Sequence, residues 1–139
     1  MSTAPKRRDP RPFALDLRSG VPIYRQIIDQ VVGGIATEAL TVGDQLPTVR
    51  QLAVDLAINP NTVIRAYREL ELQGVLETQQ GTGTFVSHQK RRANGGERQR
   101  RLAQIAGEFA ARAGSEGITV EELIRHLQDL QKDAGPRKG

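Results

Sequence analysis

Between residues 59 and 70, polar side chains recur at helical spacing opposite an apolar stripe. Val63, Ala66, Tyr67 and Leu70 fall on one side of a helical wheel. The other face carries Asn61, Arg65 and Arg68, with Thr62 and Ile64 at its flanks. An amide can bond adenine twice, a guanidinium can bond guanine or a phosphate, and an aliphatic group can touch a thymine methyl. This face is therefore suited to contact DNA, unless Asn61 only supports the helix start and the arginines are simply solvated.

The same stretch begins with residues that suit the start of a helix but not its interior. Asn59 can act as an N-cap, because its side-chain oxygen can accept a hydrogen bond from a backbone amide in the first turn. Pro60 then takes the first helical position, where its missing amide hydrogen costs nothing. The pair predicts a helix that starts sharply at residue 60.

Two further groups could contact the phosphate backbone of the same DNA. Arg50 falls in the first turn of a preceding helix, where a cation opposes the helix dipole and a phosphate contact would explain it. Gly81, Thr82 and Gly83 form a hairpin tip with exposed amides and no bulky side chain. The simpler explanation for the glycines is that a tight hairpin needs them, and they lack the context of a phosphate-binding loop.

Local signals place three helices before that hairpin. Pro22 suits the first position of a helix whose apolar residues follow at helical spacing. Thr48 and Gln51 have the spacing of a capping box at the start of a short second helix. Gly74 is suited to end the third helix as a C-terminal cap.

The order of these elements indicates a fold class. Residues 75–78 and 84–87 have strand character on either side of the glycine tip. Helix, helix, tight break, helix and hairpin predict a winged helix-turn-helix domain over residues 21–88. The chain is thus expected to be mainly α with a small β-hairpin.

The rest of the chain is expected to divide into four segments. These are a flexible N-terminal arm (1–20), a basic linker (89–97), a helical dimerisation region (98–132) and a disordered tail (133–139). Residues 98–132 read as two amphipathic helices that cannot fully bury their apolar faces on each other, so they must dock on the winged domain or pair with a second chain. The apolar residues expected at a homodimer interface are Leu102, Ile105, Phe109, Leu123, Ile124, Leu127 and Leu130.

Composition excludes several other classes of protein. The 139 residues include no cysteine, so a disulfide framework, a thiolate metal site and a cysteine nucleophile are absent. His88 and His126 have no partners at metal or triad spacing, and a helix start accounts for Glu121-Glu122. We expect no catalysis, no metal and no cofactor. The lack of an apolar run of roughly 20 residues, or of a secretion signal, indicates a cytoplasmic protein without a membrane helix.

Four motifs in order resemble the DNA-binding domain of the GntR family of bacterial transcription regulators, over about residues 13–87. They are residues 22–27 (PIYRQI), residues 43–53 (GDQLPTVRQLA), residues 59–67 (NPNTVIRAY) and residues 81–86 (GTGTFV). The short C-terminal region is similar to that of the YtrA-type subfamily. One departure is Glu38, which stands where many members have a glycine at the end of the first helix.

The resemblance implies a homodimeric repressor that binds an inverted repeat in double-stranded DNA. The family's phosphate-binding arginine carries over to Arg50, its recognition-helix positions to Asn59, Asn61, Thr62 and Arg65, and its wing-tip glycine to Gly81 or Gly83. The net charge of +4 fits a polyanionic partner without requiring one. A small-molecule effector is possible, and its identity is open. The alternative is a winged-helix adaptor that contacts protein or RNA without sequence-specific DNA binding.

Overall fold

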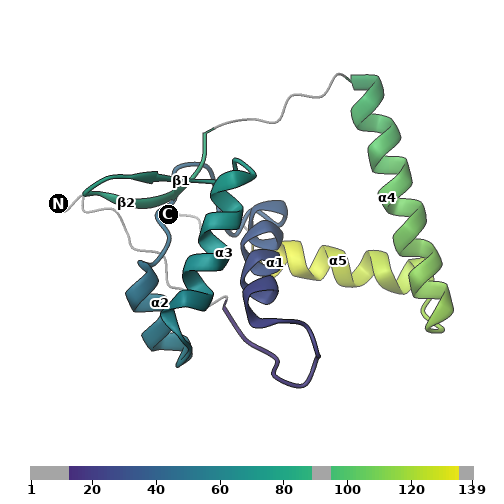
Figure 1. The fold of residues 1–139 in the computed structure, drawn as a ribbon. Coiled ribbons are helices and arrows are strands. Elements are labelled where there is room, and N and C mark those ends of the chain that lie inside the picture. Colours follow the sequence, from purple (N-terminus) through teal and green to yellow (C-terminus); the bar gives the residue numbers. More distant parts are fainter. Residues whose placement is uncertain (1–12, 89–94, 135–139) are drawn as a thin grey trace. The chain divides into compact units, whose positions relative to one another are not determined.

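The computed structural model describes residues 13–88 and 95–134, which belong to two compact units divided after residue 89 (Figure 1). The N-terminal unit contains three helices followed by a hairpin: α1 (Ile23–Ala36), α2 (Val49–Leu56), α3 (Pro60–Leu72), β1 (Leu76–Gln79) and β2 (Gly83–Val86). The C-terminal unit contains α4 (Gly95–Ser115) and α5 (Val120–Ala134). The prediction of a mainly helical chain with a small hairpin is confirmed.

The core of the N-terminal unit lies where α3 packs between α1 and α2. Its completely buried side chains are aliphatic and include Ile27 and Val31 of α1, Leu52 of α2, and Val63 and Leu70 of α3. Deleting a buried aliphatic side chain of this kind typically costs about 2–5 kcal/mol. This packing fixes the face of α3 that turns away from the core.

The starts of α2 and α3 follow the local sequence signals. Thr48 Oγ1 accepts the Gln51 N–H at 3.0 Å and the Gln51 side chain accepts the Thr48 N–H at 3.1 Å, which completes the capping box. Asn59 Oδ1 accepts the Asn61 N–H at 2.8 Å, with Pro60 at the first helical position. Between the helices Ala57 adopts the left-handed conformation (φ +57), which turns the chain sharply without a glycine.

The hairpin is an antiparallel pair in which Leu76 lies opposite Val86 and Gln79 opposite Gly83. Gly74, with φ +78, lies just beyond the C-cap of α3 and leads the chain into β1. Both strands start and end one residue away from the expected positions, a difference typical of strand ends.

The segment before α1 is attached to that helix by Gln30, whose side chain forms two hydrogen bonds with one residue. Its Oε1 accepts the Ala14 N–H at 2.8 Å, and its Nε2 donates to the Ala14 carbonyl oxygen at 2.7 Å. Phe13 and Leu15 pack against the core from the same segment. This attachment differs from the flexible arm expected over residues 1–20, of which residues 1–12 lie outside the described part of the chain.

Gln26, one helical turn before Gln30, is the second attachment point and is buried. Its Oε1 accepts the Asp16 N–H at 2.8 Å, and its Nε2 donates at 2.9 Å to the carbonyl oxygens of Asp16 and Val21. The same nitrogen lies 3.2 Å from Ser19 Oγ. A single amide thus holds a loop of six residues in place.

Two positions around α1 differ from expectation. Pro22 is the N-cap and the helix begins at Ile23, one residue later than the pattern predicts. Glu38, two residues after the helix ends, adopts φ +69. An L-residue is disfavoured in this region of backbone space, so Glu38 occupies a place that suits glycine better.

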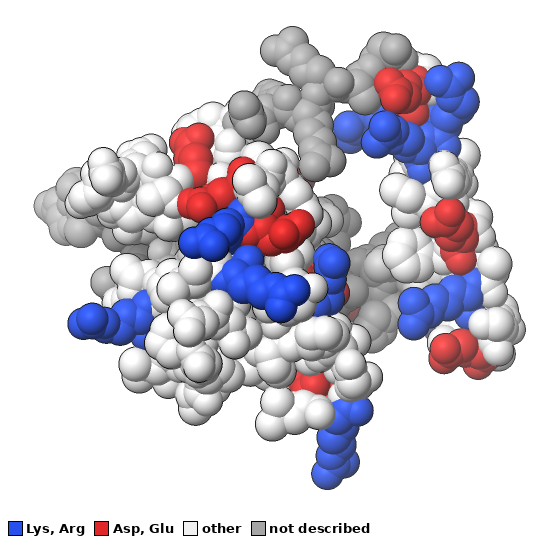
Figure 2. Space-filling view, in the orientation of Figure 1, with Lys and Arg blue, Asp and Glu red and all other residues white. Residues whose placement is uncertain are grey.

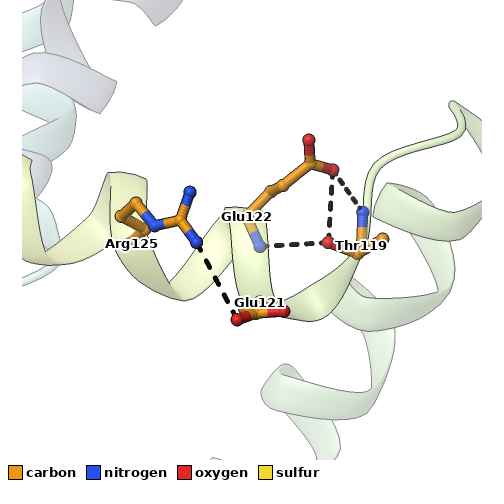
Figure 3. A network of polar contacts seen from close by, with 4 residues as sticks. All are labelled: Thr119, Glu121, Glu122 and Arg125. Carbon is orange, nitrogen blue, oxygen red and sulfur yellow. Dashed lines mark hydrogen bonds and ion pairs between the residues drawn. The ribbon is translucent and has the colours of Figure 1, made fainter.

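In the C-terminal unit, α5 begins with a second capping box (Figure 3). Thr119 Oγ1 accepts the Glu122 N–H at 3.1 Å, and Glu122 Oε1 accepts the Thr119 N–H at 2.9 Å. Glu121 forms an exposed ion pair with Arg125 at 3.8 Å. Capping of the helix start and a surface ion pair therefore account for the adjacent carboxylates Glu122 and Glu121.

The boundaries of the C-terminal helices differ slightly from the expected segments. α4 begins at Gly95, within the expected linker of residues 89–97, and α5 continues to Ala134, within the expected tail of residues 133–139. Residues 89–94 and 135–139 lie outside the described part of the chain.

Candidate nucleic-acid interface

The outward face of α3 carries the polar side chains expected from the sequence. Asn61, Arg65 and Arg68 are exposed, Ile64 is 37% exposed and Thr62 is half-buried. Asn59 uses its side-chain oxygen to cap the helix. Among the described residues, the Asn61 side chain takes part in no hydrogen bond, so its amide is free for an external partner.

Arg65 has a partner that the helical wheel does not reveal. Its guanidinium carbon lies 3.8 Å from the centroid of the Tyr24 ring, which is on α1. The two residues are 41 positions apart, so only the packing of α1 against α3 brings them together. Tyr24 is thus a neighbour of Arg65 that sequence patterns could not identify.

Arg50 lies in the first turn of α2 and is exposed. The chain just before α2 runs antiparallel beside β2, with a bridge between Gln45 and Phe85. The Leu46 N–H donates to the Thr84 carbonyl oxygen at 2.8 Å. The hairpin is therefore fixed to the same short segment, residues 43–47, from which the helix of Arg50 begins.

The hairpin tip is fixed by a side chain of that segment. Gln45 Nε2 donates to the Thr82 carbonyl oxygen at 3.2 Å. A Cβ on Gly83 would lie only 2.5 Å from Gln45 Nε2, so a side chain there would displace the Gln45 amide from its bond to Thr82. Gly81, with φ +78, has open space around it. The tip thus exposes backbone at two glycines that carry no side chain, and Gln45 holds it in place.

Tyr67 connects α3 to the same segment from the other side. Its hydroxyl donates to the Pro47 carbonyl oxygen at 2.8 Å, and its ring is buried. Burial disfavours the charged phenolate and raises the pKa of Tyr67 well above its usual range. Residues 43–47 thus join α2, α3 and the hairpin into one body. The sequence pattern predicts Tyr67 only as a core residue, without this hydrogen bond.

Charge is mixed over the face of the molecule shown in Figure 2. In this view the Lys and Arg side chains of the described residues lie among Asp and Glu side chains. Because the net charge is only +4, contact with phosphates depends on where individual Lys and Arg side chains lie.

The apolar side chains of α4 and α5 remain largely exposed within one chain. Seven of them have exposed fractions between 45% and 57%: Leu102, Ile105, Phe109, Val120, Ile124, Leu127 and Leu130. Leu123 is half-buried, and Ala113 is the one buried residue among residues 95–133. Two helices that contact each other only in part leave an apolar surface that is typical of an interaction site.

The histidines offer no constellation for catalysis. His88 is exposed beside Gly43, and His126 is exposed on α5. Across residues 13–88 and 95–134, no three His, Asp or Glu side chains gather in a way that could hold a metal ion. The helices in these two ranges include none that is long and apolar enough to cross a membrane.

Comparison with known proteins identifies the family. The profile described as "Bacterial regulatory proteins, gntR family" matches residues 23–86. The chain is 34% identical to the HTH-type transcriptional repressor YtrA of Bacillus subtilis over 119 residues, which is 86% of this chain and 92% of the relative. It is 36% identical to the HTH-type transcriptional regulator Rv1152 of Mycobacterium tuberculosis over 86% of this chain and 93% of that protein.

A solved structure agrees with this assignment. The GntR family transcriptional regulator from Listeria monocytogenes matches with a TM-score of 0.56 and 33% identity, over 81% of this chain and 98% of the other. These relatives are transcription regulators, which confirms the prediction that the chain is not an enzyme. The chain therefore belongs to the GntR family of bacterial regulatory proteins and is a DNA-binding transcription regulator similar to the YtrA type.

Proposed function

We propose that the protein is a repressor that binds an inverted-repeat operator as a homodimer. In each subunit α3 enters the major groove, Arg50 contacts a phosphate of the flanking backbone, and the hairpin tip of Gly81, Thr82 and Gly83 approaches the neighbouring groove or backbone. The Bacillus subtilis relative is named as a repressor, which supports this sign of regulation.

The observation that carries the proposal is the joining of α2, α3 and the hairpin by residues 43–47. Hydrogen bonds from Leu46, Gln45 and Tyr67 attach this segment to both other elements. Arg50, the outward face of α3 and the hairpin tip are consequently presented by one body. A rigid presentation reduces the entropy that is lost on binding.

Base reading is assigned to the middle of the α3 face. Asn61 has an unengaged amide, which could bond adenine, and Arg65 has a guanidinium that could bond guanine. Ile64 and Thr62 are placed to touch a thymine methyl. Arg68, one turn further along, suits a backbone phosphate, and Asn59 acts at the helix start.

Homodimerisation is assigned to the apolar surface of α4 and α5. An inverted repeat has two half-sites about one DNA turn apart, and a two-fold dimer presents two identical reading helices to them. The exposed apolar side chains from Leu102 to Leu130 are of a kind that a second copy of the same helices could cover.

The test is gel-shift binding to the promoter region of its own gene in a salt series, with scrambled DNA as the control. The proposal expects clear preference for the promoter, and equal affinity for both would contradict it. Arg65→Ala should relax base preference with a loss of roughly 1–3 kcal/mol, whereas Arg50→Ala should weaken all sequences alike and flatten the salt dependence. A promoter-reporter fusion separates repression from activation, since loss of a repressor raises expression.

A further inference from the structure

Arg65, on the proposed DNA-contacting face, has its guanidinium over the ring of Tyr24. Tyr24 is the second residue of α1 and is half-buried, with part of its ring packed against the core. Arg65 is exposed on α3, and its guanidinium carbon lies 3.8 Å from the ring centroid. A separation this short places the cation against the ring, within the range of a cation–π contact.

Stacking has a different chemical consequence from an ion pair. A guanidinium is planar, and its five N–H donors point outward in its plane. A contact over a ring gives the N–H donors no oxygen acceptor, whereas a carboxylate would engage them. Among residues 13–88 and 95–134, Arg65 forms no ion pair and no hydrogen bond through its side chain. Its donors are therefore held in place while they remain available.

We propose that Tyr24 is a positioning residue for DNA binding, whose ring holds the Arg65 guanidinium ready to donate to DNA. The inference rests on the proposed function, because it gives Arg65 a contact with the operator. The ring, and not the hydroxyl, is the group that acts. An otherwise flexible arginine loses less conformational freedom on binding when a neighbouring ring already restricts it.

The experiment is a double-mutant cycle on operator affinity. Tyr24→Leu removes the ring and should weaken binding about threefold to fivefold, the size of an exposed cation–π contact. Tyr24→Phe keeps the ring and should bind as the wild type does. Because Tyr24 acts through Arg65, Tyr24→Leu should cause no further loss in an Arg65→Ala background.

Arg50 provides the matched control, because it is an exposed arginine on another helix. The losses from Tyr24→Leu and Arg50→Ala should add, since the two residues share no contact. A Tyr24→Leu protein with wild-type affinity would overturn the inference. So would a loss from Tyr24→Leu that is as large in the Arg65→Ala background as in the Arg50→Ala background. Weak binding by Tyr24→Phe would assign the effect to the hydroxyl and would overturn it as well.

Two measurements separate this inference from the proposed function and from a folding defect. The wild type is first compared on operator and scrambled DNA, and equal binding there contradicts the proposed function itself and removes the basis of the inference. If Tyr24→Leu fails to fold, the wild-type protein still gives an answer by NMR. The Arg65 side-chain protons should then be shifted upfield by the ring in free protein and in the operator complex, and an unshifted signal in both would overturn the pair.

Discussion

The hydroxyl of Tyr67 donates a hydrogen bond of 2.8 Å to the carbonyl oxygen of Pro47. This bond joins the middle of α3 to the residue that precedes the capping box of α2. A buried phenol thus adds a hydrogen bond to the aliphatic packing between α3 and the start of α2.

Tyr67→Phe should lower the free energy of unfolding by about 1 kcal/mol, because it leaves the Pro47 carbonyl oxygen without its donor. Urea denaturation measures this loss. Tyr24→Phe is the matched control, since its tyrosine is only half-buried and should change stability by less. Equal losses in the two variants would show that the Pro47 contact contributes nothing specific.

The same phenol should make stability sensitive to alkaline pH. Burial raises the pKa of Tyr67 above its ordinary value, which lies near 10, so the unfolded chain loses this proton first as the pH rises. The associated stability is present in full below about pH 10 and decreases above it, by up to about 1.4 kcal/mol per pH unit. Urea denaturation from pH 9 to 11.5 should therefore show a steeper decline for the wild type than for Tyr67→Phe. Parallel declines would contradict the assignment.

Gly83→Ala should disturb the hairpin more than Gly81→Ala. Alanine at Gly81, with φ +78, would be strained by roughly 1–2 kcal/mol. Gly83, with φ +140, lies outside the left-handed helical region, and its Cβ would also push the Gln45 amide away from Thr82. Thermal unfolding compares the two variants. Adding Gln45→Ala should recover part of the loss in Gly83→Ala and none in Gly81→Ala. Recovery in neither variant would contradict the proposed clash.

Glu38→Gly should raise stability by a few tenths to about 1 kcal/mol. The substitution removes the strain of an L-residue at φ +69. Glycine also raises the conformational entropy of the unfolded chain, which offsets part of this stabilisation. Arg68→Gly, at an exposed position in the middle of α3, should instead cost about 0.5–1 kcal/mol. Denaturation midpoints that move in the same direction for both variants would refute the argument.

Leu127→Glu should convert the proposed dimer into a monomer, because it places a charge in the apolar surface of α5. Gln128→Glu adds the same charge at the next residue, which is also exposed, and should leave the assembly unchanged. Sedimentation velocity distinguishes the two states. A dimer that persists in Leu127→Glu would place the interface elsewhere.

The sequence predicted those parts of the fold that depend on neighbouring residues. The N-cap at Asn59, the capping box of Thr48 and Gln51, and the glycine after α3 each depend on a few adjacent side chains and backbone groups. Their physical cause is contained within one or two turns of chain, so reading the sequence is sufficient.

Contacts between distant segments could not be predicted in this way. The stacking of Arg65 on Tyr24 and the bond from Tyr67 to Pro47 depend on how helices pack, which residue periodicity does not specify. Glu38 and Ala57 adopt the left-handed conformation, which a glycine in the sequence usually indicates. Because neither residue is a glycine, that indication is missing at both turns. The roles of individual DNA-contacting residues stay predictions for the same reason, since they depend on a partner molecule.

The attachments made by Gln26 and Gln30 carry a consequence for sequence design. Each side chain accepts one backbone N–H and donates to at least one backbone oxygen, which only a carboxamide of this length can do at both ends. Glutamate would turn a negative oxygen toward carbonyl oxygens, and lysine would leave the N–H without an acceptor. Only a glutamine side chain can therefore form both kinds of bond at these positions. A library of variants should keep Gln26 and Gln30 so that the chain before α1 stays attached.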